Sequence, residues 1–238
     1  YDRDGGLRKG FKYNDETNRM EWVWRLEDSV LFENHFPKLD DRGFCLLRDY
    51  NGDGFEDIFS TNNYDKIQVF RNTTSNSQIS FESEILELET KNNNQKHPIR
   101  LYGNRIPVLD DLDDDGDLDL LFFAENLANQ PFGCGTFASF TNQSMEEYGI
   151  PDSLKFAVQG RCWGKITPAA GTGANNWRPY NCDTTCQNDG NRGRDITMTQ
   201  AMHDLNGDGT LDLLITYDHG DDLFAMYNEG SNSAGTIN

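Results

Sequence analysis

The chain has 238 residues, with 40 Asp and Glu against 21 Lys and Arg, and a net charge of −19. This balance argues against binding to nucleic acid, which needs a basic face, and against docking on an anionic membrane surface. No run of eighteen apolar residues is present, so we expect no direct membrane insertion. Metal cations are the natural partners of such acidity, although composition alone favours the simpler explanation, that the acidic residues keep the protein soluble.

The chain opens inside a recurring pattern. FKYN at 11–14 places an aromatic residue shortly before Asn, and the same marker returns as VFRN, SFTN and AMYN, which end at Asn72, Asn142 and Asn228. Each of these three follows an acidic motif, whereas FKYN has none ahead of it. We therefore expect the chain to be a processed product or part of a longer protein, with the first motif lying upstream.

Four strands are predicted around the first acidic motif. Alternating apolar and polar residues in the last two are typical of half-buried strands. The four stretches are GFCLLRDY (43–50), EDIFSTN (56–62), KIQVFRN (66–72) and ISFESEILEL (79–88).

The same order recurs twice more, and no helical pattern appears beyond one possible turn at MEEYGI (145–150). Apolar strand-like runs flank the later motifs as RIPVL (105–109) and LLFFAEN (120–126), then as TMTQAM (197–202) and LLITYD (213–218). Four short antiparallel strands in a unit of about 60 residues are typical of a propeller blade. We predict an all-β fold, a partial β-propeller of about three to four blades with calcium loops.

The predicted units are parts of one propeller domain, which covers 1–238. They comprise the end of a blade (1–38), a blade (39–97), a blade with a Cys-rich insertion at 160–194 (98–195) and the start of a blade (196–238). Propellers usually have four to eight blades, so the remainder of the chain is expected to complete the ring.

Three acidic loops share the pattern D-x-[DN]-x-D-G-x-x-D. They are the first loop, DYNGDGFED (49–57), the second loop, DLDDDGDLD (111–119), and the third loop, DLNGDGTLD (204–212). Positions 1, 3, 5 and 9 carry carboxylate or amide oxygens, and the backbone carbonyl at position 7 is a further candidate ligand. Six to eight flexible oxygen ligands favour Ca²⁺ over Mg²⁺.

The helical EF-hand site is excluded by position 12, where that site needs an acidic residue. Position 12 is Ser60, Phe122 and Ile215 in the three loops, and a strand follows the Asp at position 9 in each.

These loops resemble FG-GAP or VCBS-type repeats, which occur in integrin α-subunit propellers and in bacterial secreted proteins. The sequence around these loops is similar to that of surface proteins of Bacteroidetes exported by the type IX secretion system. The resemblance implies about three Ca²⁺ ions, each held at the loop between the first two strands of a blade. With the carbonyl at position 7 included, the ligands would be Asp49, Asn51, Asp53, Phe55 and Asp57; Asp111, Asp113, Asp115, Asp117 and Asp119; and Asp204, Asn206, Asp208, Thr210 and Asp212. The second loop, with four carboxylates at positions 1, 3, 5 and 9, should bind most tightly.

Disulfides are predicted in the Cys-rich region, which indicates an oxidising, extracytoplasmic location. Cys134, Cys162, Cys182 and Cys186 allow three connectivities, while Cys45 lies in an apolar strand and is predicted to be a buried free thiol.

The Cys-rich insertion is either a recognition loop or a surface insertion that is held by disulfides and binds no ligand. Its candidate contact residues are Arg161, Trp163, Trp177, Arg178 and Tyr180.

The remaining candidates carry weaker signals. Trp22 and Trp24 are predicted to belong to a blade core. None of the four His has a catalytic partner at an informative spacing, and NTT (72–74) and NQS (142–144) match the Asn-glycosylation pattern.

We expect no enzymatic activity. The function predicted is that of a secreted or cell-surface calcium-binding repeat protein, a binding or structural module whose partners are other surface proteins or glycans. The alternatives are a carbohydrate-active enzyme on a propeller scaffold and a docking subunit of an envelope or secretion complex.

Overall fold

The structure is a computed structural model, which describes most residues of the chain. These are residues 11–14, 19–22, 37, 39, 43–62, 65–75, 79–92, 95–101, 106–124, 135–168, 177–179, 181, 198–217, 223–232 and 235–237.

The first large sheet is a four-stranded antiparallel meander whose strands match the four predicted stretches. Its strands, in both chain and spatial order, are β3 (Cys45–Arg48), β4 (Asp57–Asn62), β5 (Lys66–Asn72) and β6 (Phe81–Ile85). The half-buried pattern expected for β5 is not found, because Ile67, Gln68, Val69 and Phe70 are all buried. Its polar Gln68 is satisfied there by donating from Nε2 to the carbonyl of Thr61 at 3.2 Å.

The second sheet contains six strands. Four form an antiparallel meander in chain order: β9 (Val108–Asp110), β10 (Asp119–Ala124), β11 (Thr136–Asn142) and β12 (Phe156–Trp163). The hairpin of β7 (Glu89–Asn92) and β8 (Gln95–Pro98) extends this sheet through a parallel pairing of β7 with β12. All but the last residue of this hairpin belongs to the 39–97 unit predicted from the sequence, yet the hairpin pairs with the sheet that follows.

Smaller elements complete the described part. A three-stranded antiparallel sheet is formed by β15 (Met198–His203), β16 (Asp212–Tyr217) and β17 (Leu223–Met226). Two separate hairpins are β1 (Phe11–Asn14) with β2 (Arg19–Trp22), and β13 (Ile166–Pro168) with β14 (Trp177–Pro179). The turn predicted near 145–150 is the short helix α2 (Ser144–Tyr148), which ends at Gly149 with φ 73°.

Strand β10 separates two hydrophobic cores. Leu120 and Phe122 face the core shared with the first sheet, whereas Leu121 and Phe123 face the core shared with the third sheet. Alternate side chains of a strand point to opposite faces, so a strand covered on both faces is apolar throughout. The run LLFFA therefore occupies a strand with sheets on both sides.

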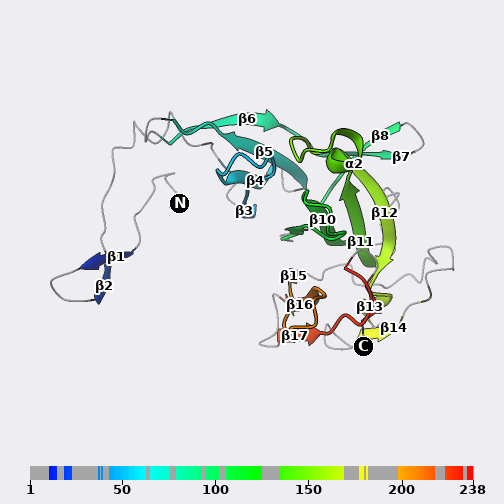
Figure 1. The fold of residues 1–238 in the computed structure, drawn as a ribbon. Helices are drawn as coiled ribbons and strands as arrows, with labels where there is room; N and C mark the ends of the chain where they lie inside the picture. The colour runs from blue at the N-terminus through cyan, green and yellow to red at the C-terminus, as the bar shows by residue number, and fades with distance from the viewer. Residues whose placement is uncertain are drawn as a thin grey trace.

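Strand β9 lies against β15, and the end of β3 contacts β9 from the first sheet; Figure 1 shows the three sheets one after another. Arg48 at the end of β3 donates from Nε to the carbonyl of Leu109 in β9 at 2.9 Å. Ile106, just before β9, forms a parallel bridge with Thr199 in β15. The fold is thus mostly β, built of several antiparallel sheets side by side, and no sheet of the described residues closes on itself.

The cysteines follow the expectations in part. Cys162 is disulfide-bonded, and Cys45 is free, but Cys45 is exposed rather than buried as predicted, because its side chain lies on the outer face of β3. Among the described residues, no helix has the length and hydropathy needed to cross a membrane.

Candidate metal centre

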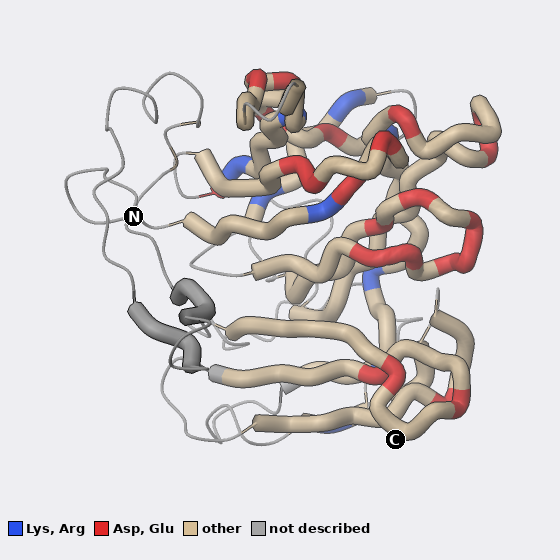
Figure 2. The backbone as a smooth tube through the Cα atoms, turned by 60° about the vertical axis from the view of Figure 1, so that its left-hand side comes forward, with Lys and Arg blue, Asp and Glu red and all other residues tan. Residues whose placement is uncertain are grey.

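The three acidic loops connect the first and second strands of three neighbouring sheets and open on the same side of the molecule. Each loop leaves β3, β9 or β15 and enters β4, β10 or β16. Because the segments preceding the second and third loops run parallel, those loops emerge at the same edge. Figure 2 shows Asp and Glu in several turns at the right-hand side of the view, with others spread over the upper strands.

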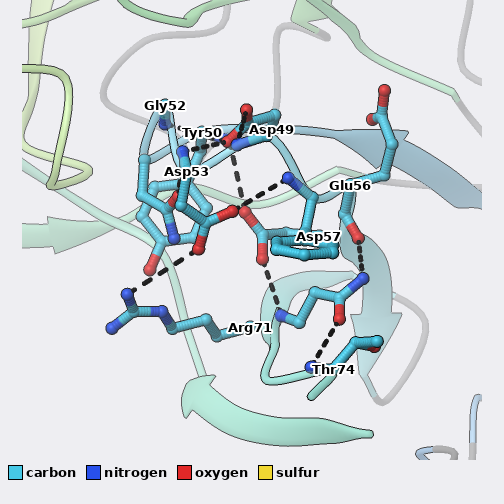
Figure 3. Close-up of polar contacts among 12 residues, drawn as sticks. Asp49, Tyr50, Gly52, Asp53, Glu56, Asp57, Arg71 and Thr74 are labelled. Carbon is cyan, nitrogen blue, oxygen red and sulfur yellow. Dashed lines mark hydrogen bonds and ion pairs between the residues drawn. The ribbon is translucent and has the colours of Figure 1, made fainter. Parts of the chain in front are cut away.

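The Asp at position 1 organises each loop by accepting hydrogen bonds from the backbone that follows it. In the first loop, Asp49 Oδ1 accepts from the N–H of Gly52 at 2.8 Å (Figure 3). Asp49 Oδ2 accepts from the N–H of Gly54, also at 2.8 Å. In the third loop, Asp204 accepts from Gly207 at 2.7 Å and from Gly209 at 3.0 Å. These bonds wrap the chain around the carboxylate of position 1.

The second loop repeats this arrangement. Asp111 Oδ1 accepts from the N–H of Asp115 at 3.1 Å, and Oδ2 accepts from the N–H of Gly116 at 2.9 Å. The Gly at position 6 has a positive φ in every loop, as its place in the motif predicts: 86° at Gly54, 97° at Gly116 and 88° at Gly209. A residue with a Cβ would be strained there, although nothing lies within 4 Å of the place that the Cβ would take.

The Asp at position 9 is wholly buried and clamps the loop to the third strand of its sheet. In the first loop, Asp57 Oδ1 accepts from the N–H of Asn72 at 2.7 Å, and Oδ2 accepts from the N–H of Tyr50 at 3.3 Å. Asp119 and Asp212 make the equivalent bonds. Asp119 accepts from the N–H of Asn142 at 2.8 Å and from the N–H of Leu112 at 2.9 Å. Asp212 accepts from the N–H of Asn228 at 2.8 Å and from the N–H of Leu205 at 3.0 Å.

The Asn of the aromatic–Asn marker, which the sequence showed without a reason, is the residue whose backbone N–H binds the Asp at position 9. The side chain of Asn228, also fully buried, donates from Nδ2 to the carbonyl of Leu211 at 3.3 Å and accepts from the N–H of Gly230 at 2.9 Å. The Asn marker is thus the residue where the third strand meets the loop. Asn142 is buried in the same way, so the NQS sequon is not accessible to a glycosyl group.

Three carboxylates converge in the second loop. Carboxylate oxygens of Asp111, Asp113 and Asp115 lie within 4.8 Å of one another. Asp113 Oδ1 and Asp115 Oδ2 are shielded from solvent and have no hydrogen-bond partner. Burial, reinforced by the neighbouring acidic groups, raises the pKa of Asp113 to about 6. Such oxygens are costly unless a cation satisfies them.

Asp117 also contributes its side chain, where the sequence predicted only its backbone carbonyl. The residue is 2% exposed, and its Oδ2 accepts from the N–H of Met145 in α2 at 3.0 Å. Its Oδ1 is shielded and has no partner, and burial raises its pKa to about 6. Carboxylate oxygens of Asp115, Asp117 and Glu146 form a second group within 4.8 Å. Sequence reasoning missed Glu146, whose proximity had no signal in the spacing.

Position 3 distinguishes the first and third loops from the second. Asn51 Oδ1 accepts from the N–H of Asp53 at 2.9 Å, and Asn206 Oδ1 accepts from the N–H of Asp208 at 2.8 Å. Thr210 donates to Asp208 from both its hydroxyl and its backbone, and these bonds lower the pKa of Asp208. Positions 1 and 5 therefore supply two carboxylates in these loops, and both loops are more exposed than the second.

The described candidates from the Cys-rich insertion divide between core and surface. Trp163 is 1% exposed and donates from Nε1 to the carbonyl of Asn232 at 2.7 Å, so its predicted role as a surface contact is wrong. Trp177 is half-buried and stacks on Phe137 with centroids 5.7 Å apart. Arg161 and Arg178 are exposed.

Several other candidates lie outside the described residues or away from the loops. His203 ends β15 as an exposed strand residue, and His97 lies in β8. Tyr180, Trp24, His35 and His219 lie outside the described residues, as does the side chain of Trp22.

Comparison of the chain with protein-family models, with curated proteins and with solved structures gives no match.

Proposed function

We propose that this chain is an extracellular calcium-binding repeat protein in which the metal ions fix the acidic loops of propeller blades. It would act as a binding or structural module for other surface proteins or for glycans. The FG-GAP or VCBS-type resemblance of the loops agrees with this role.

The observation that carries the calcium proposal is the set of unpartnered carboxylate oxygens in the second loop. Asp113 Oδ1, Asp115 Oδ2 and Asp117 Oδ1 are all shielded from water. Buried carboxylates without partners are strongly unfavourable, and a hard divalent cation satisfies several at once. A flexible set of carboxylate, amide and carbonyl oxygens favours Ca²⁺, because Mg²⁺ requires a tight octahedron and retains water.

The blade interpretation is supported by sheet order and by the adjacency of first strands. A meander of four antiparallel strands, with its first strand beside the first strand of the next sheet, is the arrangement of propeller blades around an axis. The first sheet and strands β9 to β12 of the second follow this order, and β15 to β17 supply three strands of a third unit.

The extracellular assignment is supported by the disulfide at Cys162, since disulfides persist in oxidising compartments. Ions held by loop carboxylates and backbone carbonyls serve to organise structure, so the loops favour a module that binds partners over an enzyme.

Thermal unfolding of the purified chain in Ca²⁺ and in excess chelator tests the calcium proposal. At ten times the dissociation constant, each ion adds about 1.4 kcal/mol to the free energy of unfolding. For a domain of this size, each 1 kcal/mol raises the Tm by about 2–4 °C. We expect Ca²⁺ to raise the Tm well beyond the effect of equal Mg²⁺. An unfolding curve that does not respond to chelator would overturn the proposal.

The binding role is tested separately. Incubation with polysaccharides should release no products, while immobilised chain in Ca²⁺ should retain specific surface proteins or glycans that chelator elutes. Turnover of a sugar substrate would instead make the protein an enzyme.

A further inference from the structure

We propose that Asp115, Asp117 and Glu146 hold a second divalent cation beside the one expected at Asp111, Asp113 and Asp115. This inference rests on the proposed calcium binding of the acidic loops and adds a site formed between the second loop and helix α2. The ligand class is a hard cation, with Ca²⁺ as the expected occupant.

Asp117 and Asp115 each present a carboxylate oxygen that is shielded from solvent and has no hydrogen-bond partner, as expected of metal ligands. Asp117 is 2% exposed, and one of its oxygens is occupied by the N–H of Met145. Its Oδ1 is shielded from solvent and has no hydrogen-bond partner. The Asp117 carboxylate belongs to the group that Asp115 and Glu146 complete. Asp115 resembles it, because its Oδ1 accepts from the N–H of Asp117 at 3.0 Å while its Oδ2 has no partner.

Glu146 completes the group from a different part of the fold. It lies in the first turn of α2, and its Oε1 accepts from Nε2 of Gln143 at 3.2 Å. The helix is held in place by Ser144, which is fully buried and donates from Oγ to the carbonyl of Ile150 at 2.6 Å. Because Glu146 is exposed, a cation can reach the group from solvent.

The charge of the second loop calls for more than one ion. The two groups together contain five carboxylates: Asp111, Asp113, Asp115, Asp117 and Glu146. One divalent cation would leave a formal charge of about −3 among them and two would leave about −1, which lowers the repulsion between like charges. Among the described residues, no ion pair neutralises these five carboxylates, and the nearby Lys155 pairs instead with Glu147 at 3.1 Å.

The first and third loops cannot form an equivalent site. Position 7 is Phe55 in the first loop and Thr210 in the third. The hydroxyl of Thr210 donates to Asp208 at 2.6 Å and lies 2.8 Å from the carbonyl of Asn228, so it closes the loop internally. The extra cation is therefore a feature of the second loop alone.

Counting bound Ca²⁺ by equilibrium dialysis tests the proposal in the full chain. We expect Glu146→Gln and Asp117→Asn to bind one fewer Ca²⁺ per chain than the wild type. Asn keeps an oxygen for the Met145 N–H, and Glu146 is exposed, so neither change should prevent folding. Glu147→Gln is the matched control, because it removes the same charge from the next residue of α2, and its count should equal that of the wild type.

Mn²⁺ provides a second readout, since two ions that share a carboxylate give an exchange-coupled electron paramagnetic resonance spectrum. We expect the coupled signal in the wild type and in Glu147→Gln, and its loss in Glu146→Gln.

The outcomes separate the two proposals. Absence of Ca²⁺ binding in every variant would overturn the proposed function as well as the second site. If the loops bind Ca²⁺ but Glu146→Gln leaves the count unchanged, the second site alone is overturned, whether or not the affinity falls.

Discussion

The backbone N–H of Asn142 donates to Oδ1 of Asp119 across 2.8 Å, although the two residues are 23 positions apart. The same bond joins Asn72 to Asp57 and Asn228 to Asp212. In each unit, the last acidic residue of the loop is thereby tied to the end of the third strand. Metal affinity and sheet stability should consequently depend on the same side chain.

Substitution of this clamp should destabilise the fold even without metal. In Asp212→Asn, one of the two oxygens that accept the backbone N–H groups of Asn228 and Leu205 is replaced by an NH₂ group, which leaves a buried donor unsatisfied. We expect a loss of about 1–3 kcal/mol in the free energy of unfolding. Urea unfolding in chelator measures it, with Asp152→Asn, at an exposed position, as the control. Equal stability of the two variants would show that the clamp has no structural role.

The glycine at position 6 should matter for its backbone alone. Gly116 has φ 97°, and nothing lies within 4 Å of an added Cβ. We expect Gly116→Ala to cost about 1–3 kcal/mol, the range for a strained backbone conformation, and to weaken Ca²⁺ binding. Gly116→Asn should cost less, because Asn tolerates positive φ better than Ala. Chemical denaturation of both variants provides the comparison, and a larger loss for Asn would contradict this explanation.

The residue at position 3 should set the order of affinity among the loops. Asp113→Asn gives the second loop the Asn of the other two, and we expect its Ca²⁺ affinity to fall roughly tenfold, equivalent to about 1.4 kcal/mol. Asn51→Asp is the reciprocal change in the first loop, where Asn51 Nδ2 is buried without a partner. Its affinity should rise. Titration calorimetry on both variants tests the pair, and changes of the same sign would refute the role of this position.

Stability should depend on pH in opposite ways with and without metal. Burial raises the pKa of Asp113 and Asp117 to about 6, and raises that of Asp119 to about 8 against the lowering effect of the N–H of Asn142. Because these groups bind protons more tightly in the folded chain than in the unfolded chain, the metal-free protein should lose stability as pH rises from about 4 through about 8.

Calcium should reverse this trend, because it binds the ionised carboxylates. Its affinity should rise as pH increases through about 6, with release of protons on binding near neutral pH. Thermal melts across this pH range, in chelator and in Ca²⁺, measure both slopes. A metal-free stability that increases with pH would contradict the raised pKa values.

The strands and the internal bonds of the loops follow from local sequence. Alternating and continuous apolar runs predicted β3 to β6 within a few residues, and the motif spacing placed Gly54, Gly116 and Gly209 where positive φ is needed. These features depend on neighbours a few positions away, such as the bonds from Gly52 and Gly54 to Asp49. Local spacing is therefore sufficient to predict them.

The tertiary structure alone decided the features that join distant segments. It buried Trp163 against Asn232, paired β7 with β12 of the following sheet, and brought Glu146 beside Asp117, 29 residues earlier in the chain. The return of the chain through β10 and β11 and the packing of α2 create the last of these contacts. Sequence spacing cannot predict such neighbours, because they depend on which sheets bury their apolar faces against each other.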